Sequence, residues 1–257
     1  MHSIDVAELS RTRTGHSPEP YSRRPTALML SEENEVCRSH FGLFSRLTRH
    51  QQAQILSKGE RLIVKRGRQV FEQGAPHQGI FIIESGRVRV FYHSPAGREI
   101  TLAYWGAGHF VGGPDIFGGG THLWSGEAAS TSTVVFFQSR LLLRLVAEIP
   151  PMALSIIEGL SFKGRCYSTM AQMLGTRSMT ERLVHLLLHL TEAYGVEEDD
   201  GIVISESFTH AELASIVGAT RQWVTMNLKK LQQMGILAIR ESIITVVRPD
   251  MLAQLRH

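Results

Sequence analysis

The middle of the chain, from about residue 59 to 138, alternates apolar and polar residues in short runs that are separated by glycines. Such alternation is typical of strands, and the glycines between the runs mark turns. The expected strands are Gly79–Glu84, Val88–Tyr92, Glu99–Tyr104 and Thr131–Gln138. Many short strands at this spacing predict a sandwich or jelly roll. A helix is expected before them, over about residues 34–58, where Phe41, Phe44 and Leu47 recur three residues apart.

A long helix follows the strands. After Pro150 and Pro151 no strong helix breaker occurs until Gly175. The small and apolar residues alternate at four and three positions, as in Ala153, Ile157, Leu160, Gly164, Tyr167, Ala171 and Leu174. This is the seam of a heptad repeat over about three heptads. A lone helix in water cannot hide such a seam, so it packs on its own domain or on a twin helix. We predict that the seam packs on a twin helix from a second copy of the chain.

The stretch Phe208–Leu237 predicts two short helices joined by a tight turn. Thr209 can cap the first helix, and Glu212 completes a capping box. Gly218 lies where a left-handed turn is needed, and Thr220 can cap the second helix. The second helix has a buried stripe of Val224, Leu228 and Leu231. Because Ile239 to Val247 then reads as a β hairpin, the pattern indicates a winged helix-turn-helix, with an ordinary helical hairpin as the alternative.

The opposite face of the second helix offers chemistry for DNA. Arg can bond guanine O6 and N7 together, and Gln can do the same with adenine N6 and N7. A lysine further along the helix can meet phosphates. The predicted DNA-binding residues are Thr209, Thr220, Arg221, Gln222, Thr225 and Lys229.

Charge and composition add limits to this picture. The net charge is +3, and residues 177–257 hold eight Lys/Arg against ten Asp/Glu, so a DNA interface depends on where the charges lie. Cys37 and Cys166 make no disulfide framework and no zinc ligand set, so no metal is expected. No apolar run of membrane-spanning length and no signal peptide are visible, so we expect a cytoplasmic protein that does not bind membranes.

Several pieces of the chain, in this order and spacing, resemble the Crp/Fnr superfamily of transcription regulators. They are FGLFSRLT (41–48), VFEQGAPHQGIFIIESGRVRVF (70–91), GREITLAYWGAGHFVGG (97–113), TERLVHLLLHL (180–190) and the helix-turn-helix with its wing. The resemblance covers about residues 41–250. It implies an α+β fold with an N-terminal β-roll (jelly-roll) sensor domain, a long dimerisation helix and a C-terminal winged helix-turn-helix.

The resulting domain division has four parts. We expect a flexible tail over 1–33, a β-roll effector or sensor domain over 34–150, a dimerisation helix over 151–176 and a winged DNA-binding domain over 177–257. Family dimers bind near-palindromic DNA with recognition helices about one helical turn apart. The implied partners are double-stranded DNA, a second copy of the chain and RNA polymerase.

The recognition helix differs from that of the cyclic-AMP receptor. Arg221 occupies the position of the arginine in the family's recognition helix. Gln222 replaces a glutamate of that receptor, and Met226 replaces a second arginine. A different DNA half-site is therefore expected. The Arg-Gln pair resembles instead the carbon-monoxide-sensing heme regulator of the superfamily.

The sensor domain lacks the family's cyclic-nucleotide cassette. Relatives that bind cyclic AMP carry a Gly-Glu pair that contacts the ribose and an Arg-Ser pair that binds the phosphate. A buried phosphate requires a cation such as that arginine. Here these positions read Gly113-Pro114 and Leu123-Trp124, so cyclic AMP is not expected. Cys37 alone near the N-terminus cannot assemble the four thiolates of an iron–sulfur cluster.

Three alternatives for the effector stay open. A small uncharged or aromatic effector would lie near Gly113, Pro114, Leu123, Trp124, Phe162 and Tyr167. The second alternative is that these side chains fill the space in a ligand-independent regulator. The third is heme, for which the candidate ligands are His77, His93, His109 and His122. Because no nucleophile motif, P-loop or His-x-His cluster occurs, an enzyme is not expected.

Overall fold

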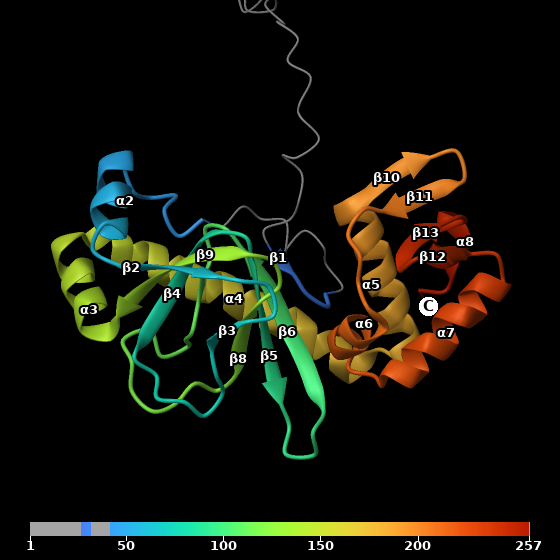
Figure 1. Ribbon diagram of the computed structural model, residues 1–257, viewed down its shortest axis with the longest axis horizontal. Helices are drawn as coiled ribbons and strands as arrows, with labels where there is room; N and C mark the ends of the chain where they lie inside the picture. Colours follow the sequence, from blue (N-terminus) through green and yellow to red (C-terminus); the bar gives the residue numbers. More distant parts are fainter. Residues whose placement is uncertain (1–26, 32–41, 257) are drawn as a thin grey trace, which may run out of the picture.

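The computed structural model describes residues 27–31 and 42–256, and it has two units linked by one long helix (Figure 1). The first unit is a β-roll of two antiparallel sheets. One sheet has the order β1 (Ala27–Leu28), β6 (Glu99–Gly106), β5 (Arg87–His93), β8 (Ser125–Ala128) and β3 (Gln69–Phe71). The other has the order β2 (Glu60–Val64), β9 (Ser132–Gln138), β4 (Gly79–Ser85) and β7 (Phe110–Val111). The four predicted strands correspond to β4, β5, β6 and β9.

The predicted helix before the strands is much shorter than expected. Of the expected range 34–58, residues 34–41 lie outside the described part, and α2 covers Arg49–Leu56. Thr48 starts this helix with a capping box to Gln51. The residues before it form tight turns, in which Leu47 N–H donates to the Phe44 carbonyl at 2.9 Å. The three-residue spacing that suggested a helix therefore comes from turns that place Leu47 in the core.

The prediction of a flexible tail is wrong for residues 27–31. Of the expected range 1–33, residues 1–26 and 32–33 lie outside the described part. Ala27–Ser31 are buried: Ala27–Leu30 each expose 1% of their surface and Ser31 exposes 3%. The physical reason is an unpaired edge of β6, along which β1 pairs through Ala27↔Trp105 and Leu28↔Tyr104.

Two helices follow the β-roll: α3 (Ser139–Glu148) and α4 (Pro150–Thr176). Prolines at the first positions of α4 suit a helix start, because their missing N–H groups would be unpaired there anyway. One face of α4 packs on its own β-roll through residues that include Met152, Ile156, Phe162, Cys166, Met170 and Met173. No helix among the described residues is both long and apolar enough to cross a membrane.

The predicted heptad seam lies on another face of α4. Ile157 is 57% exposed, Gly164 and Ala171 are exposed, and the other seam residues are half-buried. The neighbouring Leu154 is 54% exposed. The β-roll thus covers one apolar face of α4, and the heptad seam is only partly covered: Leu160, Tyr167 and Leu174 pack at the edge of the core, whereas Ile157, Gly164 and Ala171 are exposed.

The second unit begins two residues after α4. It contains α5 (Met179–Tyr194), α6 (His210–Val217), α7 (Arg221–Gln233) and α8 (Pro249–Gln254). Its sheet has the order β10 (Gly195–Glu198), β11 (Gly201–Ile204), β13 (Ile243–Val246) and β12 (Leu237–Arg240). The β12–β13 hairpin is the predicted wing. The acidic run of residues 197–200 is exposed on the β10–β11 hairpin.

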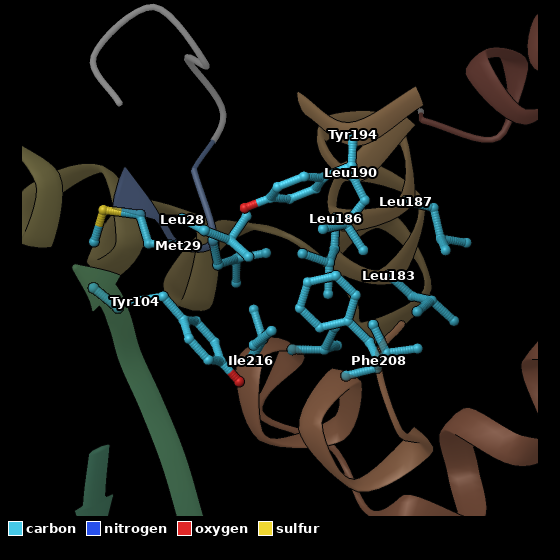
Figure 2. Packing of buried hydrophobic residues seen from close by; sticks show 14 of the residues in the cluster. Leu28, Met29, Tyr104, Leu183, Leu186, Leu187, Leu190, Tyr194, Phe208 and Ile216 are labelled. Atoms are coloured by element: carbon cyan, nitrogen blue, oxygen red, sulfur yellow. The ribbon is translucent and has the colours of Figure 1, made fainter. Parts of the chain in front are cut away.

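The two units share one apolar cluster (Figure 2). Helix α6 packs on β6, where the hydroxyls of Thr101 and Ser215 are 2.8 Å apart. Arg87 Nη1 donates to Tyr194 Oη at 2.8 Å. The rings of Tyr104 and Phe208 meet edge to face across the same boundary. The second unit is therefore packed against the β-roll of its own chain in this arrangement.

Lys163 of α4 is buried against the β-roll. Its ammonium lies 3.4 Å from the centroid of the Trp105 ring and 5.1 Å from that of Phe110. Burial lowers the pKa of Lys163 to about 7, because a low-dielectric interior disfavours the charged form. Burial, together with the charge of Lys163, lowers the pKa of the neighbouring His109 to about 3.

This burial predicts a pH dependence of stability. The folded pKa of Lys163 lies below its ordinary value, so between pH 7 and 9 the unfolded chain binds more protons and the free energy of unfolding rises with pH. The rise expected over that window is about 2 kcal/mol, from about 1.4 kcal/mol per pKa unit. Urea unfolding of Lys163→Met, which keeps the volume without the charge, should lack this rise. A variant that keeps the full rise would contradict the assignment.

Candidate functional site

The turn between α6 and α7 has the local chemistry of a helix-turn-helix. Thr209 Oγ1 accepts from the Glu212 N–H at 3.1 Å, and Glu212 Oε2 accepts from the Thr209 N–H at 2.7 Å. Gly218 ends α6 with φ 74°, a left-handed conformation that glycine adopts without a steric penalty. Thr220 then starts α7 by accepting from the Trp223 N–H at 3.2 Å.

The predicted faces of α7 are separated in space. Val224, Leu228 and Leu231 are buried, with exposed fractions of 0, 1 and 7%. All six predicted DNA-binding residues are exposed: Thr209, Thr220, Arg221, Gln222, Thr225 and Lys229. Trp223 is half-buried at the edge of the apolar face. Helix α7 thus presents a mainly polar face to solvent, interrupted by Met226, which is 58% exposed.

Thr225 has a partner that the sequence analysis missed. His210, the first residue of α6, places Nδ1 2.9 Å from Thr225 Oγ1. The Thr225 hydroxyl also bonds the Arg221 carbonyl at 2.9 Å, and its single proton can go to one acceptor at a time. His210 therefore ties the two helices at the exposed surface. No spacing or charge pattern marks His210 in the sequence.

Positive charge is concentrated on α7. The helix carries Arg221, Lys229 and Lys230, all exposed, and no acidic residue. The N-terminal turn that holds Arg221 also has unpaired N–H groups and the positive end of the helix dipole. A slightly acidic unit thus presents a helix that suits a polyanion.

The wing ends in an unusual turn. Glu241 and Ser242 have φ of 49° and 69°, the two positive values of a type I′ hairpin turn, at positions where glycine and asparagine are preferred. Arg240 before the turn is exposed, and Ile243 after it is 46% exposed. The wing tip is therefore available for contact.

Three of the six predicted effector residues form an aromatic cluster between the β-roll and α4. The ring centroids of Trp124 and Tyr167 are 6.1 Å apart, and Phe162 stacks on His109 at 5.6 Å. Trp105 joins the cluster, 6.3 Å from Tyr167. Burial raises the pKa of Tyr167 above its ordinary value. Aromatic side chains thus fill this space.

The remaining predicted effector residues lie elsewhere. Pro114 lines an open apolar groove of about 510 Å³ beside the first half of α4, and Gly113 precedes it. Leu123 is 53% exposed. The other groove residues, none of which was predicted, are Asp115, Ile116, Phe117, Gly118, Ala153, Ile156, Ile157 and Leu160. The structure therefore divides the predicted site among a filled cluster, a groove and the exposed position of Leu123.

The candidate heme ligands do not line this groove. His77 and His122 lie against each other, with ring centroids 4.5 Å apart, and His122 Nδ1 is 2.9 Å from the Gly112 carbonyl. His93 is paired with Glu99, and His109 lies within the aromatic cluster. These positions do not fit a heme in the groove. The loop through Gly118–Gly120 is bonded to His77, whose N–H donates to the Gly120 carbonyl at 3.1 Å.

Comparison with family models identifies both units. A model of the cyclic nucleotide-binding domain matches residues 61–148. A model of the Crp-like helix-turn-helix domain matches residues 181–255.

Curated relatives match across both units. The chain is 29% identical over 192 residues to the global nitrogen regulator of Synechococcus elongatus, covering 74% of this chain and 86% of that protein. It is 25% identical to a CRP-like cAMP-activated global transcriptional regulator of Mycobacterium tuberculosis, covering 74% and 84%. It is 23% identical to the fumarate and nitrate reduction regulatory protein of Escherichia coli, covering 75% and 76%.

Solved structures share the fold. The c-di-GMP responsive global regulator CLP of Xanthomonas campestris superposes with a TM-score of 0.72 at 24% identity, covering 78% of this chain and 100% of that chain. A CooA mutant from Carboxydothermus hydrogenoformans gives 0.65 at 22% identity, covering 79% and 90%. Two matched domains in the family's order, relatives that are transcription regulators and an exposed, basic α7 lead to one conclusion: the chain belongs to the Crp/Fnr family of transcription regulators and is not an enzyme.

Proposed function

We propose that the protein is a homodimer that binds a near-palindromic operator and regulates transcription from it. The single observation that carries the proposal is the surface of α7, which combines Arg221, Gln222, Thr225 and Lys229 and has no acidic residue. RNA polymerase is the partner that a bound regulator would contact. Both partners imply a cytoplasmic location.

In this proposal the first turn of α7 reads bases. Arg221 donates two bonds to a guanine, and Gln222 bonds an adenine through both of its amide atoms. Lys229, two turns further along, meets a phosphate, and Thr209, Thr220 and Thr225 lie at the margins of the contact. Because the Thr209 and Thr220 hydroxyls already cap helices, their main role is to position α6 and α7.

The dimer would form through the exposed seam of α4. Ile157 and Leu154 are more than half exposed on α4, with the half-buried Leu160 nearby, and exposed apolar patches of this kind are typical of interaction sites. Two parallel copies of α4 bury the seam and place their α7 helices side by side. Half-sites one helical turn apart follow from that symmetry.

An effector would act at the groove beside α4. The groove is mainly apolar, so it suits a small apolar or aromatic molecule. It is lined by Ile157 and Leu160, which also belong to the seam, so occupancy would favour one arrangement of the paired helices. The hinge to the DNA-binding unit is Arg177–Ser178, between α4 and α5. A ligand-independent regulator is the alternative, supported by the filled aromatic cluster.

Base reading is tested with duplexes that the purified protein selects from a random library. Arg221→Ala with Gln222→Ala should weaken binding to the selected duplex by about 100-fold or more, since each paired base contact contributes about 1–3 kcal/mol. Gln233→Ala, an exposed glutamine at the far end of α7, is the matched control and should bind normally. Fluorescence anisotropy measures both. Unchanged affinity of the double variant would refute the proposed readout.

The dimer is tested by placing a charge on the seam. Ile157→Asp should shift the chain from dimer to monomer in sedimentation velocity, because a buried unpaired carboxylate opposes association. Ile63→Asp makes the same change at a residue that is 76% exposed on β2 and should remain dimeric. If both variants sediment like the unmodified chain, α4 is not the dimer interface.

The groove is tested by native mass spectrometry of protein isolated from its host. Under the effector proposal the chain carries additional mass, and Asp115→Trp, which fills the groove, loses it. Asp199→Trp, at an exposed site on the β10–β11 hairpin, should retain it. No additional mass in any sample supports the ligand-independent alternative, and mass retained by Asp115→Trp places the effector elsewhere.

A further inference from the structure

The segment Ala27–Ser31 occupies the boundary between the two units. Its first two residues form β1, which extends the sheet of the β-roll by pairing with Tyr104 and Trp105 of β6. A strand that pairs with a sheet edge gains affinity from main-chain hydrogen bonds. Its side chains give specificity by fitting the neighbouring surface. At Ala27 and Leu28 the segment therefore pairs with β6 as a docked peptide pairs with a sheet edge.

The segment is buried on both of its sides. In a strand with one face covered, alternate side chains are exposed, but Ala27, Leu28, Met29 and Leu30 all expose 1%. Figure 2 shows Leu28 between Tyr104 of β6 and the side chains of α5, with Leu186 and Tyr194 nearby. One side of the segment thus contacts the sensor unit and the other contacts the DNA-binding unit.

A polar contact secures the end of the segment. Ser31 Oγ donates to Thr169 Oγ1 of α4 at 3.2 Å. Five consecutive residues therefore connect β6, α4 and α5, which are the strand, the long helix and the first helix of the DNA-binding unit.

The other contacts between the units include several polar ones. Arg87 reaches Tyr194 at 2.8 Å and Glu206 at 3.3 Å, and Arg98 Nη2 reaches the Gly218 carbonyl at 3.3 Å. Polar contacts between units are typical of boundaries that can move. Leu28, Met29 and Leu30 add apolar packing at this boundary, beside the packing of α6 on β6, so the segment is one of the contacts that hold the units in one orientation.

We propose that Ala27–Ser31 is a docking peptide in cis and that the groove between β6 and α5 is a peptide-binding surface for a short apolar strand ending in a small hydroxyl residue. Occupancy of the groove orients the DNA-binding unit on its β-roll. In a dimer it also sets the spacing of the two α7 helices, a consequence that rests on the proposed function. Loss of the segment lets the two units reorient relative to each other. Binding to an operator with two half-sites then carries the entropic cost of ordering the units.

The test compares full-length variants by hydrogen exchange and by affinity for the selected duplex. Leu28→Asp should raise amide exchange in β6 and α5 and weaken operator binding, each by about ten-fold or more, because local opening exposes both elements. Ile63→Asp, the same type of change at an exposed site, should alter neither readout. Unchanged exchange in Leu28→Asp overturns the docking proposal. Raised exchange with unchanged affinity overturns the orienting role.

A peptide supplied in trans separates docking from misfolding. A chain lacking residues 1–31 should regain protection of β6 and α5, and operator affinity, when a synthetic peptide of residues 24–33 is added. The same peptide with Leu28→Asp should restore neither, and a chain lacking only residues 1–26 should need no peptide. Failure of the unmodified peptide overturns the peptide-binding surface. If the full chain binds no duplex, the proposed function fails, and hydrogen exchange alone decides the docking.

Discussion

The structure depends on one constraint, which is that α4 has more apolar surface than its own chain can cover. Phe162, Cys166 and Met170 of α4 belong to the core, and each is almost fully buried. Ile157 and Leu154 of the same helix expose more than half of their surface. Burial of apolar area is the main favourable force in folding and association. The face that completes one chain and the face that would join two chains therefore lie on the same helix.

This arrangement links the groove beside α4 to the helix-turn-helix by a short route. The groove beside Pro114 includes α4 residues of the seam, and α4 ends two residues before α5. A change in how two copies of α4 pack would thus reach α6 and α7 through rigid helices. The docking segment Ala27–Ser31 adds a second connection, from β6 directly to α5, which bypasses the hinge.

The DNA-binding unit shows why total charge is a poor guide to function. The unit is slightly acidic, yet four of its acidic residues, 197–200, lie on the β10–β11 hairpin. The charged residues of α7 are all basic. The buried stripe Val224, Leu228 and Leu231 determines which way α7 faces, so the cations are exposed because the opposite face is apolar. His210 then holds Thr225 at the same surface.

Local chemistry in the sequence was enough to determine four strands of the β-roll (β4, β5, β6 and β9), the limits of α4, the caps at Thr209 and Thr220 and the turn at Gly218. These features depend on residues a few positions apart, whose side chains satisfy the ends of a helix or the period of a strand. Three features were decided by the tertiary structure alone. Ala27–Ser31 became part of the core because an edge of β6 and a face of α5 meet over it, and Phe44 and Leu47 lie in turns because the core, rather than helix periodicity, determines their spacing. The predicted effector residues were divided among a filled cluster, a groove and the exposed position of Leu123, since whether side chains line a cavity or fill it depends on contacts between segments far apart in the chain.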